Sequence, residues 1–161
     1  MNENVQAEPQ SELFESYQEY TDASQGSRFI NYLVDNLFMQ FVLSYGSGYV
    51  VGYLLSVIAP DFLYKITEGG ESSGNVILFS LILAYFNYFI YYTICEAAFK
   101  GYTLGKLISG TKAIREDGEP LTFKDAILRS LSRLVPFEPF SALGGRPWHD
   151  KWTNTRVIKA R

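Results

Sequence analysis

Two long uncharged apolar runs constrain the fold of this chain more than any other feature. Residues 37–59 carry no charged side chain in 23 positions, and residues 76–95 carry none in 20. A helix rises about 1.5 Å per residue and the hydrocarbon core of a bilayer is about 30 Å thick, so each run is long enough to cross a membrane. We therefore predict an all-α transmembrane protein whose two membrane-spanning helices cover about residues 29–59 and 76–99.

Two other interpretations of the apolar runs fit the sequence less well. A soluble protein of 161 residues with both runs in its core would keep almost no polar helix face for water. A cleaved signal peptide is disfavoured because the first 27 residues are polar, with six acids and no Lys or Arg. We expect residues 1–27 to be an acidic mobile tail and residues 28–161 to form the membrane domain.

The distribution of basic residues predicts the orientation. Twelve of the fourteen Lys and Arg residues lie in the segment 100–161, so the positive-inside rule places this segment, and with two spans also the N-terminus, in the cytoplasm. The expected location is the inner (cytoplasmic) membrane, with a multi-pass topology. A basic segment beside a bilayer favours contact with anionic lipid headgroups and makes nucleic acid a poor partner.

The cytoplasmic segment contains short signals for β structure. The sequence TKAIREDGEPLTF suggests a small β hairpin, with a strand at Ala113 and Ile114 followed by the Asp117-Gly118 turn. The run TRVIK, residues 155–159, is a second β-type stretch that could pair with this strand.

Between these strands the sequence predicts an amphipathic cytoplasmic helix. Thr122 can cap it, with Asp125 three residues later. Its predicted apolar stripe lies opposite Lys124, Arg129 and Arg133 and consists of Phe123, Ala126, Ile127, Leu131, Leu134 and Val135. The helix should lie in the membrane interface or dock under the spans. For residues 136–145, a third re-entrant segment and an interfacial position both stay open.

Three charged residues are expected at the inner boundary of the spans. An isolated carboxylate at Asp35, seven residues into the first span, costs on the order of 2.5 to 3.5 kcal/mol, so it needs a partner or a proton. Arg28 lies about 10.5 Å away on the same helical face, with Asn31 between them. Glu96 ends the uncharged part of the second span at a similar depth. We therefore predict a cluster of Arg28, Asp35 and Glu96.

The spacing allows several roles for this cluster. It could be a structural ion-pair network that sets helix register, or it could take up and release a proton or cation during transport, since carboxylates inside membranes often mark ion pathways. Plain snorkelling of the charged groups is the third alternative. Separately, Gly48 and Gly52 form a GxxxG pattern that predicts close helix packing, within the chain or in an oligomer.

The stretch GYTLGK, residues 101–106, is similar to a phosphate-binding loop but lacks its chemistry. Only three residues separate Gly101 from Gly105, Leu107 stands where the loop needs a hydroxyl, and a membrane helix precedes it instead of a strand. The single histidine, His149, lies beside Asp150 and cannot build a metal site alone. We find no nucleophile motif and no Rossmann glycines, so we expect no enzyme activity, no cofactor and no metal.

The order of these motifs resembles the RDD family of small membrane proteins. The resemblance covers residues 28 to about 159 and rests on RFINYLVD (28–35), ICEAAFKGYTLGKLISGTKAI (94–114), DGEPLTFKDAILRSLSRL (117–134) and WHDKWTNTRVI (148–158). It implies that GYTLGK is the turn from the second span into the cytoplasmic segment. There the glycines permit tight geometry, and Lys106 faces headgroups or an acid.

The family is named for one Arg and two Asp residues. Arg28 and Asp35 match the first two, while the place of the second Asp falls either at Asn36 or at Asp150. Some members are associated with cation/proton antiport and others with the assembly of larger membrane complexes. We accordingly expect a transport-related role that uses the Arg/Asp/Glu cluster, in a homo-oligomer or with a membrane protein partner. The competing hypothesis is a non-catalytic scaffold or assembly partner.

Overall fold

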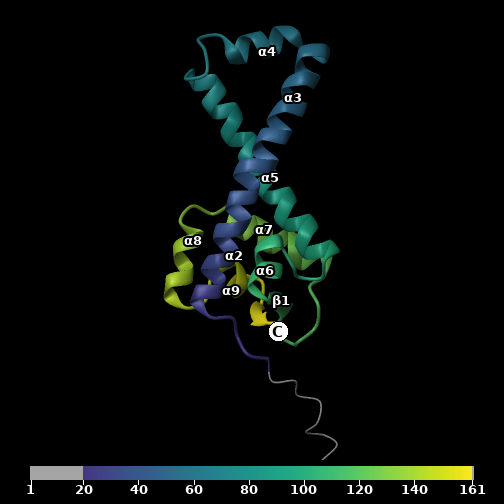
Figure 1. Cartoon of the computed structure of the whole chain (residues 1–161), viewed down its shortest axis with the longest axis vertical. Coiled ribbons are helices and arrows are strands. Elements are labelled where there is room, and N and C mark those ends of the chain that lie inside the picture. The colour runs from purple at the N-terminus through teal and green to yellow at the C-terminus, as the bar shows by residue number, and fades with distance from the viewer. Residues whose placement is uncertain (1–19, 161) are drawn as a thin grey trace, which may run out of the picture.

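The computed structural model describes residues 20–160, as two long helices that stand on a compact base (Figure 1). The first long helix runs from Gln25 to Ile58 and consists of α2 (Gln25–Phe38), a π-helical segment η1 (Met39–Leu43) and α3 (Ser44–Ile58). The second is α5 (Gly74–Ala98). Both predicted spans are thus confirmed as helices, each beginning slightly earlier than expected.

The outer half of the molecule consists of α3, α5 and the short helix α4 (Pro60–Thr67) that connects them. The long helices cross near their middle and separate toward α4 (Figure 1). Near the crossing, the Asn87 amide donates to the Ser47 hydroxyl at 2.7 Å. The most apolar stretch of the first helix has 0% of its residues buried, and that of the second has 17%. Apolar helices that remain uncovered in this way are typical of segments that face lipid or other chains.

Gly48 and Gly52 of the first long helix have no close neighbour within the described chain. A methyl group added at either position would meet no atom of the described residues within 4 Å. Of the two predicted kinds of packing, the described chain thus shows none inside one chain. Their packing against another chain stays a prediction.

The base, which we call the basal module, comprises residues 20–38 and 88–160. Beyond the ends of the long helices it contains α6 (Leu104–Ser109), β1 (Thr111–Arg115), α7 (Phe123–Arg133), α8 (Glu138–Ser141), η2 (Ala142–Gly144), α9 (Trp148–Trp152) and β2 (Thr155–Lys159). The two strands pair antiparallel, with Ala113 opposite Val157. A small apolar core forms around this pair from Ala23, Ala113, Leu121 and Val157.

The β structure differs in part from the prediction. Pairing of TKAIR with TRVIK is confirmed, but the predicted hairpin at Asp117-Gly118 contributes only one bridge, from Ile114 to Pro120. The end of the predicted tail also belongs to the module, because the Ala23 amide donates to the Val157 carbonyl at 2.9 Å and Asp22 bridges to Ile158. The rest of the predicted tail, residues 1–19, lies outside the described residues.

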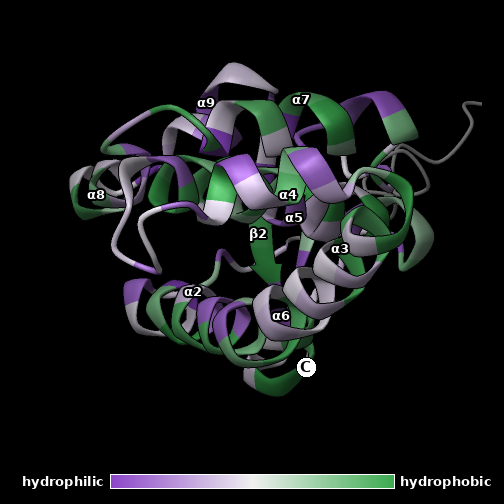
Figure 2. Cartoon of the chain, turned by 90° about the horizontal axis from the view of Figure 1, so that it is seen from above, coloured by the Kyte–Doolittle hydropathy of each residue, from purple (hydrophilic) through white to green (hydrophobic). Residues whose placement is uncertain are grey.

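Helix α7 forms with the predicted cap, and it buries its arginine side together with Ala126 of the predicted apolar stripe. The Thr122 side chain accepts from the Asp125 amide, and the Asp125 carboxylate accepts in return from the Thr122 amide. Arg129 and Arg133 are buried, whereas the apolar residues Phe123, Leu128 and Leu131 are exposed. Hydrophobic residues accordingly lie on the outer side of α7 (Figure 2). The arginine side is buried because carboxylates of α5 and α9 pair with it.

The segment 136–145 folds into α8 and η2 on the flank of α2 (Figure 1). Neither element is long enough to cross a bilayer. Phe137, Phe140 and Leu143 are largely exposed, whereas Glu138 is buried. The described residues therefore contain two candidate spans and no third.

Candidate functional site

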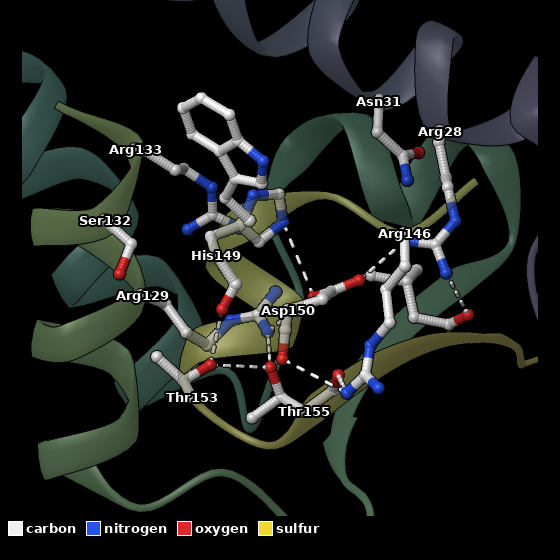
Figure 3. Close-up of polar contacts among 12 residues, drawn as sticks. Arg28, Asn31, Arg129, Ser132, Arg133, Arg146, His149, Asp150, Thr153 and Thr155 are labelled. Atoms are coloured by element: carbon white, nitrogen blue, oxygen red, sulfur yellow. Dashed lines mark hydrogen bonds and ion pairs between the residues drawn. The ribbon is translucent and has the colours of Figure 1, made fainter. Parts of the chain in front are cut away.

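Buried ion pairs connect the long helices to the rest of the basal module. They come from α2, α5, α6, α7 and α9, and their charged groups lie within direct contact of one another. Figure 3 shows the part around Asp150. We call this set the ionic network; it consists of Arg28, Glu96, Lys106, Arg129, Arg133 and Asp150.

Glu96, in the last turn of α5, is fully buried and contacts three cations. Its Oε1 accepts from Lys106 Nζ at 2.5 Å and from Arg133 Nη2 at 2.7 Å. Its Oε2 accepts from Arg129 Nε at 2.8 Å. The two arginines share one face of α7 because they lie four residues apart. Glu96 thereby joins α5, α6 and α7, and removing one partner from such a buried pair is strongly destabilising.

Asp150, in α9, is the second buried acid of the ionic network. Its Oδ2 accepts from Arg28 Nη1 at 2.6 Å and its Oδ1 from Arg129 Nη1 at 2.7 Å (Figure 3). Burial opposes ionisation of this carboxyl, but its neighbours, Arg129 first among them and then His149 and Arg28, together outweigh burial and hold the pKa of Asp150 well below its usual value. Arg129 thus bridges Asp150 and Glu96, and through them the beginning of α2 and the end of α5.

Burial also changes the protonation of two neighbouring groups. Burial, together with Arg133, lowers the pKa of His149 to about 4, so its imidazole is neutral at pH 7. Its Nδ1 lies 2.5 Å from Oε1 of Glu138, and a neutral ring donates to this carboxylate from Nδ1. Burial lowers the pKa of Lys106 to about 8, although Glu96 opposes this shift. Lys106 therefore remains mostly protonated at neutral pH.

Asp35, in α2, is buried to 1% exposure and is held differently from Glu96 and Asp150. Its Oδ1 accepts from the Tyr91 hydroxyl at 2.7 Å and from the Gly105 amide at 2.7 Å. Its Oδ2 accepts from the Thr103 hydroxyl at 2.8 Å. Within the described residues, no Lys, Arg or His forms an ion pair with it. Its ionised form thus depends on neutral hydrogen-bond donors alone.

The GYTLGK turn builds most of the Asp35 site. Gly101 has φ +96° and lies so close to β1 that a Cβ would come within 2.0 Å of the Ala113 carbonyl oxygen. At Gly105 a Cβ would lie 2.3 Å from the Asn31 carbonyl oxygen, so only glycine lets α6 approach α2 this closely. Thr103 caps α6 by accepting from the Lys106 amide. The turn thus delivers two donors to Asp35 and the ammonium group of Lys106 to Glu96.

Asn31, one turn before Asp35, completes the contact between α2 and α6. Its side-chain amide lies between the hydroxyls of Ser109 and Thr111, 2.9 Å from the latter. The residue is buried at 7% exposure. This amide therefore fixes the register of α2 against the beginning of β1.

Helix length allows Asp35 to lie outside the part of the first long helix that could cross a membrane. The helix Gln25–Ile58 has 34 residues, about 51 Å at 1.5 Å per residue, which exceeds a bilayer core of about 30 Å. The uncharged run 37–59 is long enough to cross alone. The half of α2 that carries Asp35 is covered by α6, so this acid lies where the span enters the basal module.

The predicted cluster does not form as one contact group. Arg28 contacts Asp150 instead of Asp35, and it reaches Glu96 only through Asp150 and Arg129. The reason is that α6 fills the space beside Asp35. Of the two places considered for the family's second Asp, Asp150 is the one beside Arg28, whereas the Asn36 amide donates to the Tyr32 carbonyl.

Sequence analysis missed four residues that make these sites: Arg129, Arg133, Thr103 and Tyr91. The two arginines were placed opposite the apolar stripe without partners, although their i, i+4 spacing shows a polar stripe on α7. The acids Glu96 and Asp150 could have indicated the partners of these two arginines. Nothing in the sequence around Tyr91 distinguishes it from its aromatic neighbours.

A cavity of about 380 Å³ adjoins both sites. Its polar wall includes Arg28, Asp35, Lys106 and Arg133, and its apolar wall includes Phe29, Tyr32, Tyr92, Phe140 and Leu143. In the part of the chain that the structure describes, no group of three or more His, Cys, Asp or Glu residues could hold a metal ion.

Comparison with known proteins identifies one relationship. The model of the RDD family matches residues 23–154, which is most of the chain. Searches of curated proteins and of solved structures found no match.

Proposed function

The chain belongs to the RDD family, and from this premise we propose that it acts in cation/proton exchange across the inner membrane, with Asp35 as the group that takes up and releases the ion. Family membership and two apolar helices fit an integral membrane protein. The proposal of ion exchange rests on the Asp35 site. Its carboxylate is buried where the first long helix enters the basal module, and among the described residues it accepts hydrogen bonds from uncharged donors only.

The other two members of the predicted cluster suit this role less well. Glu96 is bound by three cations and Arg28 is bound to Asp150. Breaking a buried pair by removing one partner costs about 3–5 kcal/mol. If either residue took up and released an ion, this free-energy cost would arise in every transport cycle. We therefore propose Asp35 alone, of the three predicted residues, as the ion-binding group.

The hydrogen bonds of Asp35 are compatible with both protonation states. A hydroxyl can donate or accept, whereas a backbone amide only donates. Oδ1 accepts from the Gly105 amide, and Oδ2 contacts only the Thr103 hydroxyl among the described residues. A proton on Oδ2 could therefore be donated to Thr103 Oγ1 once the threonine hydroxyl rotates. The Asp35 carboxyl would then be hydrogen-bonded in both protonation states.

A complete pathway would need more than one protomer in this proposal. The outer halves of the long helices are largely uncovered in the described chain. Further copies of the chain, or a membrane partner, would supply the missing walls. The twelve basic residues of the segment 100–161 support a cytoplasmic location for the basal module and both termini.

The test is ion-driven proton flux in proteoliposomes that contain the purified protein. We expect cation-dependent flux in the wild-type protein and its loss in Asp35→Asn. Asp117→Asn is the matched control, because this acid is exposed at the surface of the same module. Equal flux in Asp35→Asn and wild type, or no flux with any of Na⁺, K⁺ and Li⁺, would contradict the proposal.

The open glycine face supports a second candidate function, a scaffold or assembly partner of a larger membrane complex. Gly48 and Gly52 leave space for a helix from another chain. A Cβ at Gly48 meets no atom of the described chain within 4 Å, so Gly48→Leu places an apolar side chain in that space, and a loss of co-purifying or cross-linked protein would report on intermolecular packing. Gly46→Leu, whose Cβ also meets no atom within 4 Å in the described chain, controls for added hydrophobicity.

A further inference from the structure

The cavity beside α2 is lined on one side by charged residues and on the other by apolar residues. It lies between α2, α5, the end of α7 and α8, at the place where the long helices enter the basal module. Its volume of about 380 Å³ falls within the range of small-molecule sites, about 300–1,000 Å³. Neither the ionic network nor the Asp35 site requires an open space of this size.

Cations outnumber acids along the cavity wall. Arg28, Lys106 and Arg133 line it, against the two carboxylates of Asp35 and Glu138. His149 also lines it, as a neutral ring. Each of these cations also pairs with Glu96 or Asp150 behind the wall, so an anionic group is favoured only where a donor of these cations is left unpaired.

Arg133 provides a donor for such an anion. Its side chain is only 5% exposed, its Nη2 donates to Glu96, and its guanidinium lies 4.3 Å from the centre of the Tyr92 ring. Its Nη1 has no hydrogen-bond partner among the described residues. The Nη1 atom is itself buried, so the side chain must shift for it to reach an acceptor oxygen in the cavity. That contact would be stabilising, because a buried guanidinium N–H left unpaired costs free energy.

Large apolar side chains surround the opening of the cavity. Phe29, Phe140 and Leu143 line it and are 63%, 67% and 78% exposed. These residues lie on or beside α2, at the end of the first long helix that enters the basal module. Lipid headgroups would lie there if residues 37–59 cross a bilayer. A ligand that suits both walls has an anionic head and an apolar chain.

We propose that this cavity binds one phospholipid with a net negative headgroup, whose phosphate contacts Arg133 and whose acyl chain leaves past Phe29 and Phe140 into the adjacent leaflet. The bound lipid would anchor α8 against α2 and α5. This inference does not depend on ion exchange, because a scaffold protein could use the same site.

The test is a lipid titration of the full-length purified protein in non-ionic detergent, followed by native mass spectrometry. We expect one phosphatidylglycerol per chain, bound about tenfold more tightly than phosphatidylcholine with the same acyl chains. Phe140→Asp places a negative charge at the opening and should weaken phosphatidylglycerol binding about tenfold. Phe123→Asp is the matched control, because Phe123 is 65% exposed and does not line the cavity.

The conservative variant Arg133→Lys tests the proposed contact between Arg133 and the lipid phosphate. Arg133→Lys keeps a cation beside Glu96 but cannot present a second planar N–H to a phosphate. We expect it to remain folded, to bind both lipids, and to lose the preference for phosphatidylglycerol. If Arg133→Lys unfolds, the preference is read from Phe140→Asp alone.

Three results would overturn the proposal. The first is equal affinity for both lipids in the wild-type protein, which indicates ordinary annular lipid. The second is an equal loss of binding in Phe140→Asp and Phe123→Asp. The third is displacement of phosphatidylglycerol by millimolar glycerol phosphate, which indicates a site for a soluble anion. Tenfold selectivity lost in Phe140→Asp and kept in the control supports the lipid site.

Discussion

Arg28 and Asp150 are 122 residues apart in the sequence, and their side chains form an ion pair of 2.6 Å. The pair joins the beginning of α2 to α9, close to the place where residues 21–23 run beside β2. Closing a loop of this length costs conformational entropy that local contacts alone would not repay. The ionic network therefore closes the basal module around the first and last described segments of the chain.

Asp150→Asn tests the stabilising role of this network. The substitution removes the carboxylate from Arg28 and Arg129, and we expect it to lower the free energy of unfolding by about 3–5 kcal/mol, because two buried cations lose a partner. The thermal unfolding midpoint in detergent measures this effect. Asp117→Asn breaks the exposed pair with Arg115 and should change stability by only about 0–1 kcal/mol. Similar midpoints for both variants would contradict the assignment.

The largely buried His149 predicts a pH dependence of stability. Its pKa is about 4 in the folded protein and near 6.5 when unfolded, so the unfolded state binds the proton more readily. The stabilisation is fully present above pH 6.5 and is lost as the pH falls toward 4, by on the order of 3 kcal/mol. Glu138, whose pKa is also lowered, adds a loss in the same direction below its usual range.

The variant His149→Gln separates the contribution of His149 to this pH dependence from that of Glu138. The glutamine amide can still donate to Glu138 but does not titrate. We therefore expect a flatter stability profile between pH 6.5 and pH 4 in thermal unfolding series. An unchanged profile would show that other groups cause the dependence.

Gly105→Ala tests the close approach of α6 to α2. A Cβ there lies 2.3 Å from the Asn31 carbonyl oxygen, so the helices must separate and the hydrogen bond from the Gly105 amide to Asp35 weakens. We expect a loss of about 1–3 kcal/mol. At Gly52, where a Cβ meets nothing within 4 Å in the described chain, the same substitution should be neutral or stabilise the helix. Thermal unfolding of both variants checks the contrast.

Thr103 tests whether a hydroxyl beside Asp35 matters for ion exchange as well as for stability. Thr103→Val removes the cap of α6 and the donor to Asp35 Oδ2, and should cost about 1–3 kcal/mol. Thr103→Ser keeps both contacts and should retain the wild-type unfolding midpoint. In proteoliposomes we expect flux in the serine variant and reduced flux in the valine variant. Full flux with valine would remove Thr103 from the proposed proton-binding site.

Local sequence patterns predicted a helix or strand correctly where the residues of that segment are enough to specify it. The two spans, the capping box of α7 and the paired strands follow from hydropathy, cap residues and β propensity. The pattern of α7 predicted its apolar stripe and the side of its arginines, but not the partners of these arginines. Here Arg129 and Arg133 contact buried acids, while Phe123, Leu128 and Leu131 are exposed.

The sequence by itself determined that this is an RDD-type chain with two helices long and apolar enough to cross a membrane, because composition and motif order need no knowledge of contacts. Only the tertiary structure decided the partners of the charged residues. Arg28 pairs with Asp150, Glu96 with three cations, and Asp35 with neutral donors. These pairings join segments distant in sequence, and their geometry follows from how closely α6 and α7 pack against the two long helices.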